Sequence, residues 1–170
     1  MEASRVTGNL KCNSQLCYFT SSSLLKDDKT LIFISDETGD PNIFYRDLVS
    51  GEEKQLTNNT DGTLKSYVYF KGNEYRGLGK ASISVDSNFR KIYYIQGMDI
   101  CCVDMAGNIR TLNKLQENQV TAFTHVSADG KRLCVPTTDA RSLEEDNAKR
   151  SNDYETGNQR RREVISDRPN

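Results

Sequence analysis

The sequence predicts an all-β protein built from short antiparallel strands. In residues 24–57, apolar and β-branched runs at 31–34 and 43–45 alternate with turns rich in Asp, Gly and Asn. Runs of this length between such turns are typical of an antiparallel meander. Four strands in about 40 residues is the size of one sheet in a repeated array.

The same strand–turn–strand pattern recurs twice more along the chain. Leu24, Val85 and Val126 each end an apolar strand, and a polar turn residue follows three positions later in every case. One such sheet cannot bury both of its faces, so neighbouring units must stack. Because a closed β-propeller has at least four blades, we predict an incomplete β-propeller of about two and a half four-stranded blades. The predicted blades span 17–57, 80–113 and 121–138 onward.

This interpretation specifies which strands pair and which side chains are buried. Three pairs, each of an inner strand and a second strand, are expected around 20–35, 81–96 and 122–137. The side chains expected to lie buried between sheets are Leu31, Phe33, Ile92, Leu133 and Val135.

The chain divides into two regions of different composition. Residues 1–138 are expected to form the partial propeller, and 139–170 a polar, partly disordered tail. The segment 139–152 fits either a surface helix or a disordered loop. The connection 58–79 is longer than a link between blades requires, and it carries several aromatic residues. It fits either a rim element that shapes a pocket or an extra hairpin.

Composition narrows the function classes. The net charge is −1 over 170 residues, which gives no reason to expect nucleic acid or an acidic membrane surface as a partner. No apolar run is long enough to span a membrane, and no signal peptide is visible. The five cysteines show no CxxC spacing, which favours free thiols in a reducing, cytoplasmic compartment. A disulfide between Cys12 and Cys17 is the alternative.

The ordered set of motifs resembles the oligogalacturonate lyase family. The first blade, NSQLCYFTSSSLLKDDKTLIFISDETGDPNIFYRDLVSGEEKQLT, is similar to the family's first blade, and SYVYFKGNEYRGLGKASISVD and TAFTHVSADGKRLCVPTTDAR are similar to the units that follow. The similarity covers about residues 6–141. It implies a seven-bladed propeller and a cytoplasmic enzyme that cleaves short pectin-derived uronides by β-elimination.

The resemblance also implies a manganese ion held by three histidines and a glutamine from later blades. Such a cation holds the uronate carboxylate and stabilises the negative charge that develops. This sequence has one histidine, so no metal ligand is carried over and no cofactor is expected for this chain.

Three cationic residues are candidates for binding a uronate carboxylate. Arg76 and Lys80 flank Gly77-Leu78-Gly79 just before the second inner strand, where residues lie near the channel mouth of a propeller. Arg141 follows the second strand of the third unit. Arg can hold a carboxylate with two parallel hydrogen bonds. The alternatives are solvated loop residues and, for Arg141, an ion pair with Asp139.

Two polar residues complete the candidate site. His125 lies one position before the apolar column of the third inner strand and could contact a polar ligand or serve as a structural histidine. Gln15 enters the first inner strand together with Tyr18 and Thr20, and all three also fit ordinary strand or channel-filling positions.

The function hypothesis is a fragment of an oligogalacturonate lyase-like propeller that is inactive alone. The expected partner is a small uronide or oligosaccharide, together with missing C-terminal blades or further copies of the chain. The alternative is a non-enzymatic propeller module that binds protein or carbohydrate.

Overall fold

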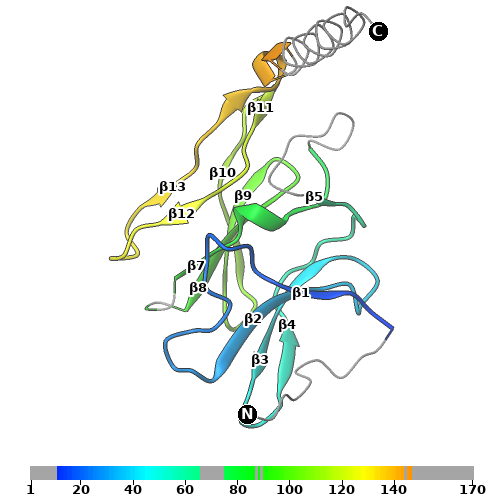
Figure 1. Ribbon diagram of the computed structural model, residues 1–170, viewed down its shortest axis with the longest axis vertical. Coiled ribbons are helices and arrows are strands. Elements are labelled where there is room, and N and C mark those ends of the chain that lie inside the picture. The colour runs from blue at the N-terminus through cyan, green and yellow to red at the C-terminus, as the bar shows by residue number, and fades with distance from the viewer. Residues whose placement is uncertain (1–10, 66–74, 87, 89, 144, 147–170) are drawn as a thin grey trace, which may run out of the picture.

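The computed structural model describes residues 11–65, 75–86, 88, 90–143 and 145–146, and β-strands dominate this part of the chain. The all-β prediction is confirmed. The first sheet pairs its strands antiparallel in chain order: β1 (Ser14–Leu16), β2 (Thr30–Ser35), β3 (Asn42–Asp47) and β4 (Glu53–Gln55) (Figure 1). Strands β2 to β4 lie within the predicted first blade, 17–57, whereas β1 lies wholly before residue 17.

The second sheet repeats this meander and adds one strand. Its members are β5 (Leu64–Lys65), β6 (Leu78–Gly79), β7 (Ser84–Asp86), β8 (Lys91–Gln96), β9 (Asp99–Asp104) and β10 (Ile109–Lys114). The strands β8, β9 and β10 pair antiparallel, and both β6 and β7 pair with β8. The added strand, β5, comes from the connection 58–79 and runs parallel to β6. Residues 66–74 of that connection, with most of its aromatic side chains, lie outside the described part.

The third unit is a single long hairpin. Its strand β11 (Gln119–Val120) pairs with β14 (Thr138–Asp139), and β12 (His125–Val126) pairs with β13 (Leu133–Cys134). The hairpin extends past the second sheet towards the top of Figure 1. Residues 140–143 and 145–146 are helical, which favours the surface helix over the disordered loop for the start of 139–152. The rest of the predicted polar tail lies outside the described residues.

All three inner strands are interrupted, and the sequence pattern did not predict this. The interruptions are residues 17–22, 80–82 and 121–124, of which 80–82 is the 3-10 helix η1 (Lys80–Ser82). Side-chain hydroxyl groups replace the missing ladder bonds. The Ser23 Oγ accepts from the Cys17 amide at 2.8 Å, the Ser82 Oγ accepts from the Ile95 amide at 2.9 Å, and the Thr121 Oγ1 donates to the Pro136 carbonyl at 2.6 Å.

The main hydrophobic core lies between the first two sheets. Ile32 and Ile34 of β2 pack there with Ile92 of β8, and all three are at most 1% exposed. Burying a side chain of this size contributes about 1.5–3 kcal/mol. Phe33 is buried as predicted, but it is not part of this core and instead stacks on Phe44 at 5.6 Å between ring centres. Alternate residues of a strand point to opposite faces, so the predicted face of β2 was wrong by one residue.

A smaller cluster joins the second sheet to the third unit. Ile95 and Leu115 are buried there, whereas Leu133 and Val135 are only partly buried. Leu31 is likewise partly buried, so these three residues, which were predicted to be largely buried, keep part of their surface exposed. The described third unit contributes one hairpin, so it covers less of the neighbouring sheet than a four-stranded blade would.

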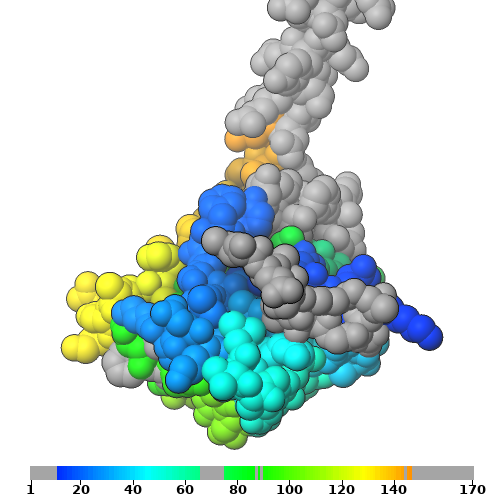
Figure 2. Space-filling model, turned by 60° about the horizontal axis from the view of Figure 1, so that its bottom comes forward, coloured from blue at the N-terminus to red at the C-terminus, as the bar shows by residue number. Residues whose placement is uncertain are grey.

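Polar contacts between successive turns join the three units along one face. The Lys26 Nζ donates to the Asn88 Oδ1 at 2.7 Å, and the Asn88 Nδ2 donates to the Ala128 carbonyl at 3.1 Å. Asn88 therefore links the turns of the first and third units. Figure 2 shows these turns together, in blue, green and yellow. The positions that repeat in the sequence thus meet in space.

Candidate functional site

The three interruptions of the inner strands lie side by side and form a surface that we call the inner edge (residues 17–22, 80–82 and 121–125). The Val85 amide donates to the Ser21 Oγ at 2.8 Å, which connects the first interruption to the second sheet. The Thr124 Oγ1 donates to the Ser82 carbonyl at 2.6 Å, which connects the third interruption to the second. Inner strands line the channel of a propeller, so this surface is the candidate site.

Lys80 is the candidate cation at the inner edge. It is the first residue of η1 and is half-buried. Within the described residues, its ammonium group takes part in no ion pair. A role of Lys80 in binding a carboxylate ligand stays a prediction.

His125 and Gln15 lie on inner strands, but they do not meet. His125 is exposed and lies opposite Cys134 in the third hairpin, directly after the interruption 121–124. Gln15 is half-buried at the centre of β1, opposite Ile34 and ahead of the first interruption. His125 thus belongs to the inner edge, whereas Gln15 belongs to the regular part of the first sheet. A ligand-binding role for either residue stays a prediction.

Arg76 and Arg141 are each paired with a carboxylate. The Arg76 Nε lies 3.0 Å from the Asp61 Oδ2, and the Arg141 Nη2 lies 2.7 Å from the Asp139 Oδ2. Hydrogen bonds from Thr63 and then from Arg76 lower the pKa of Asp61. The hydrogen bond from Arg141 is the largest cause that lowers the pKa of Asp139 to about 2. A uronate would have to compete with these carboxylates, so Lys80 is the better candidate, and binding by the two arginines stays a prediction.

An aromatic cluster at the inner edge was not predicted as a functional feature. The ring centre of Tyr18 lies 4.3 Å from that of Phe19 and 6.1 Å from that of Phe123, and the Phe19 and Phe123 centres are 6.4 Å apart. Phe19 is 80% exposed. The sequence places the adjacent pair Tyr18-Phe19 and Phe123 in two distant repeats, and the fold brings them together.

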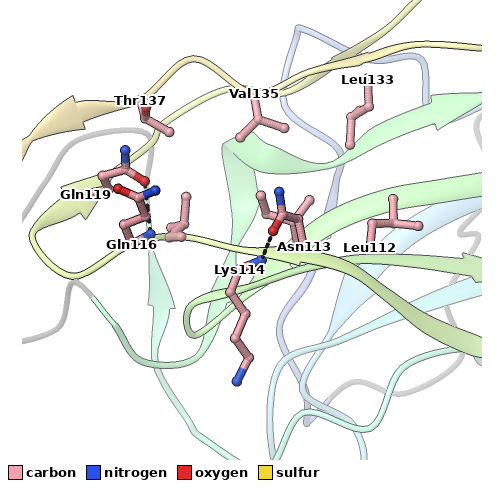
Figure 3. A pocket seen from close by; sticks show the side chains of 10 residues that line it. Leu112, Asn113, Lys114, Gln116, Gln119, Leu133, Val135 and Thr137 are labelled. Atoms are coloured by element: carbon pink, nitrogen blue, oxygen red, sulfur yellow. Dashed lines mark hydrogen bonds between the residues drawn. The ribbon is translucent and has the colours of Figure 1, made fainter.

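A groove separates the second sheet from the third hairpin. It has a volume of about 520 Å³, and Leu112, Leu115, Leu133 and Val135 are among its lining residues (Figure 3). Leu112 is 38% exposed, whereas Leu56, at the matching position of the first blade, is 3% exposed. The second sheet covers Leu56, while the described third unit has no outer strand to cover Leu112. The groove is therefore an open packing surface.

The described residues do not fit the manganese site that the family resemblance implies. Among them, no group of three or more His, Cys, Asp or Glu side chains lies close enough to hold a metal ion. His125 is exposed on a two-stranded hairpin, and its cross-strand neighbour is Cys134 rather than a second histidine or a glutamine. We therefore derive no chemical step through a metal.

Solved structures resemble this arrangement of sheets. The crystal structure of oligogalacturonate lyase from Vibrio parahaemolyticus matches 81% of this chain and 33% of its own length, with a TM-score of 0.65 and 17% identity. An oligogalacturonate lyase in complex with manganese matches 76% of this chain and 31% of its own length, with a TM-score of 0.61 and 17% identity. The chain has the fold of part of a β-propeller.

A third propeller, a putative TolB from Agrobacterium tumefaciens, matches 79% of this chain and 41% of its own length, with a TM-score of 0.52 and 18% identity. The chain thus spans about a third of the length of the two lyases. No protein-family model matches the sequence, and no curated protein matches it either. In the described part of the propeller, no helix is long and apolar enough to cross a membrane.

Proposed function

We propose that the chain is part of an oligogalacturonate lyase-like propeller and that it binds short, pectin-derived uronides at its inner edge. The observation that carries this proposal is Lys80, which is the first residue of the second interruption and takes part in no ion pair with another described residue. An ammonium group is a strong hydrogen-bond donor to a carboxylate. The likeness in fold to two oligogalacturonate lyases supports a uronide as the ligand.

The proposed role of this part of the propeller is binding rather than bond cleavage. In β-elimination, a base removes the proton next to the uronate carboxylate, the bond to the 4-linked sugar breaks, and a positive group stabilises the intermediate anion. Lys80 would hold the carboxylate and offset its charge. The described residues offer no group of side chains that could hold a metal ion, and we propose that the chain alone does not cleave the substrate.

Titration of the full chain with digalacturonate tests this proposal by calorimetry. Lys80→Gln removes the charge and keeps the length of the side chain, so we expect the dissociation constant to rise about tenfold or more. Lys131→Gln is the matched control, because Lys131 is an exposed lysine in the turn of the third hairpin. If the dissociation constant rises equally in both variants, or stays unchanged in Lys80→Gln, Lys80 does not hold the uronate.

The groove favours a second candidate function, that of a module that binds protein. Its apolar side chains and the outer strand β10, all of whose residues are exposed, would accept an extended segment of another protein. Capture of peptides by the chain, abolished by Leu112→Lys and unaffected by Lys80→Gln, would favour this function.

We also propose a cytoplasmic location. None of the five cysteines forms a disulfide, Cys12 and Cys17 included. Free thiols persist in reducing compartments. Thiol labelling of the protein in intact and lysed cells would test this location.

A further inference from the structure

We propose that Tyr18, Phe19 and Phe123 form a stacking platform for the apolar face of a galactose-configured sugar ring. The proposal rests on the function proposed above, in which Lys80 binds the carboxylate. It adds a second recognition element, which acts on the ring itself and does not require the carboxylate.

The exposure of Phe19 is the first observation. An aromatic side chain gains about 1.5–3 kcal/mol when it is buried, and Phe19 remains 80% exposed although Tyr18 and Phe123 lie next to it. Both neighbouring rings are half-buried and lie tilted against Phe19, at 43° for Tyr18 and 48° for Phe123. The cluster thus exposes the ring of Phe19 to solvent while Tyr18 and Phe123 pack against it.

The second observation is that hydrogen bonds fix both segments that carry the rings. The Ser21 amide donates to the Tyr18 carbonyl at 3.0 Å, and the Ser21 hydroxyl accepts from the second sheet. On the other side, the Thr121 and Thr124 hydroxyls donate to backbone carbonyls at 2.6 Å. A surface held in place before binding loses less conformational entropy when a ligand arrives.

The third observation concerns the chemistry of the surroundings. Both segments that carry the rings are hydrogen-bonded to the stretch that follows Lys80, through Ser82 and Val85, so a cationic residue belongs to a segment that neighbours the aromatic cluster. A galactose-configured ring has an axial hydroxyl at C4, which leaves the hydrogens of C3, C4 and C5 together on one apolar face. Galacturonate adds a carboxylate at the rim of the same ring. The apolar face of galacturonate therefore matches the aromatic cluster, and its carboxylate matches Lys80.

The test is an NMR titration of the full chain with methyl β-galactopyranoside, methyl β-glucopyranoside and digalacturonate. We expect ring currents to shift the H3, H4 and H5 signals of the galactoside upfield, with a smaller shift for the glucoside. Phe19→Ala should weaken the binding of both galactose-configured ligands about three- to tenfold, and Phe19→Trp should retain it. Val49→Ala is the control, because Val49 is a 75% exposed apolar residue on the turn between β3 and β4.

The possible outcomes separate this inference from the proposed function. Binding of digalacturonate that depends on Lys80 but not on Phe19, without ring-current shifts, would overturn the platform and leave uronide binding intact. Galactoside shifts that depend on Phe19, together with digalacturonate binding that Lys80→Gln leaves unchanged, would support the platform and contradict the carboxylate site. Loss of self-association in Phe19→Ala, with no sugar shift in the parent protein, would overturn the platform and assign the cluster to contacts between copies.

Discussion

Arg90 of the second blade donates a hydrogen bond from its Nη1 to the Oδ2 of Asp27 in the first blade, at a distance of 2.7 Å. The same carboxylate closes its own turn by accepting from the Lys29 amide at 3.0 Å and from the Thr30 amide at 2.8 Å. Asp27 thus acts both within one repeat and between two repeats. One carboxylate therefore stabilises both the turn of the first blade and its contact with the second blade.

The stability of the first turn should depend on pH through Asp27. Hydrogen bonds from the Lys29 amide, from Thr30 and from Arg90 lower the pKa of this carboxyl below its usual value of about 3.9. A carboxyl with a lowered folded-state pKa stabilises the fold above the unfolded pKa, and it loses this contribution as the pH falls towards the folded pKa. The difference in unfolding free energy between the parent protein and Asp27→Asn should narrow from about pH 5 to about pH 2. Urea unfolding at several pH values measures it, and a constant difference would contradict this account.

The core between the first two sheets should be far more sensitive to truncation than the groove. Ile92 is fully buried, so Ile92→Ala should cost about 2–5 kcal/mol of unfolding free energy. Leu112 is 38% exposed, so Leu112→Ala should cost less than about 1 kcal/mol. Urea unfolding of both variants tests the contrast, and equal costs would show that the groove is packed in solution.

The chain should associate with itself in a concentration-dependent way. The groove leaves apolar side chains of β10 and of the third hairpin open, and exposed apolar surface favours association. Leu112→Lys should shift the protein towards smaller species in size-exclusion chromatography with light scattering, whereas Val49→Lys should not. A monodisperse monomer of the parent protein that melts cooperatively would be incompatible with this prediction.

The chain alone should not cleave digalacturonate, with or without manganese. The reaction needs a positioned base and a cation site, and the described residues supply neither a multi-histidine site nor another metal-binding group. The absorbance of the unsaturated product measures the activity. Manganese-dependent turnover that His125→Ala abolishes, in protein free of host lyase, would make His125 catalytic and overturn the prediction.

The strands and their order were predictable because local signals agree with the fold. Apolar runs such as 31–34 are bounded by Asp and Gly turns, and the same turn chemistry recurs in each repeat. The interruptions of the inner strands were not predictable, because hydroxyls such as that of Ser82 replace ladder bonds only after distant residues have come together. The face of β2 was misassigned because Ile32 and Phe33 are both apolar, so the sequence does not mark which side meets the next sheet.

The candidate site was predictable only in part. Lys80 and His125 were proposed from their places next to inner strands, and both belong to the inner edge, but their roles in binding stay predictions. The partner of Arg76 is Asp61, and the partner of Phe19 is Phe123, and both pairs are distant in the sequence. Only tertiary packing determines such pairs, and no periodic pattern in the sequence predicts them.

The interrupted inner strands make the protein a natural scaffold for loop engineering. The Ser23 carbonyl accepts from the Ile32 amide of β2 at 2.7 Å directly after the first interruption, and the Ser23 Oγ accepts from the Cys17 amide at its start. Residues 18–22 therefore do not set the register of β1 and β2. Loop closure costs grow slowly with length, about 0.6 kcal/mol for each doubling. Libraries of longer or recombined segments grafted at 18–22 should therefore fold on the same sheets and present new recognition chemistry at one fixed location.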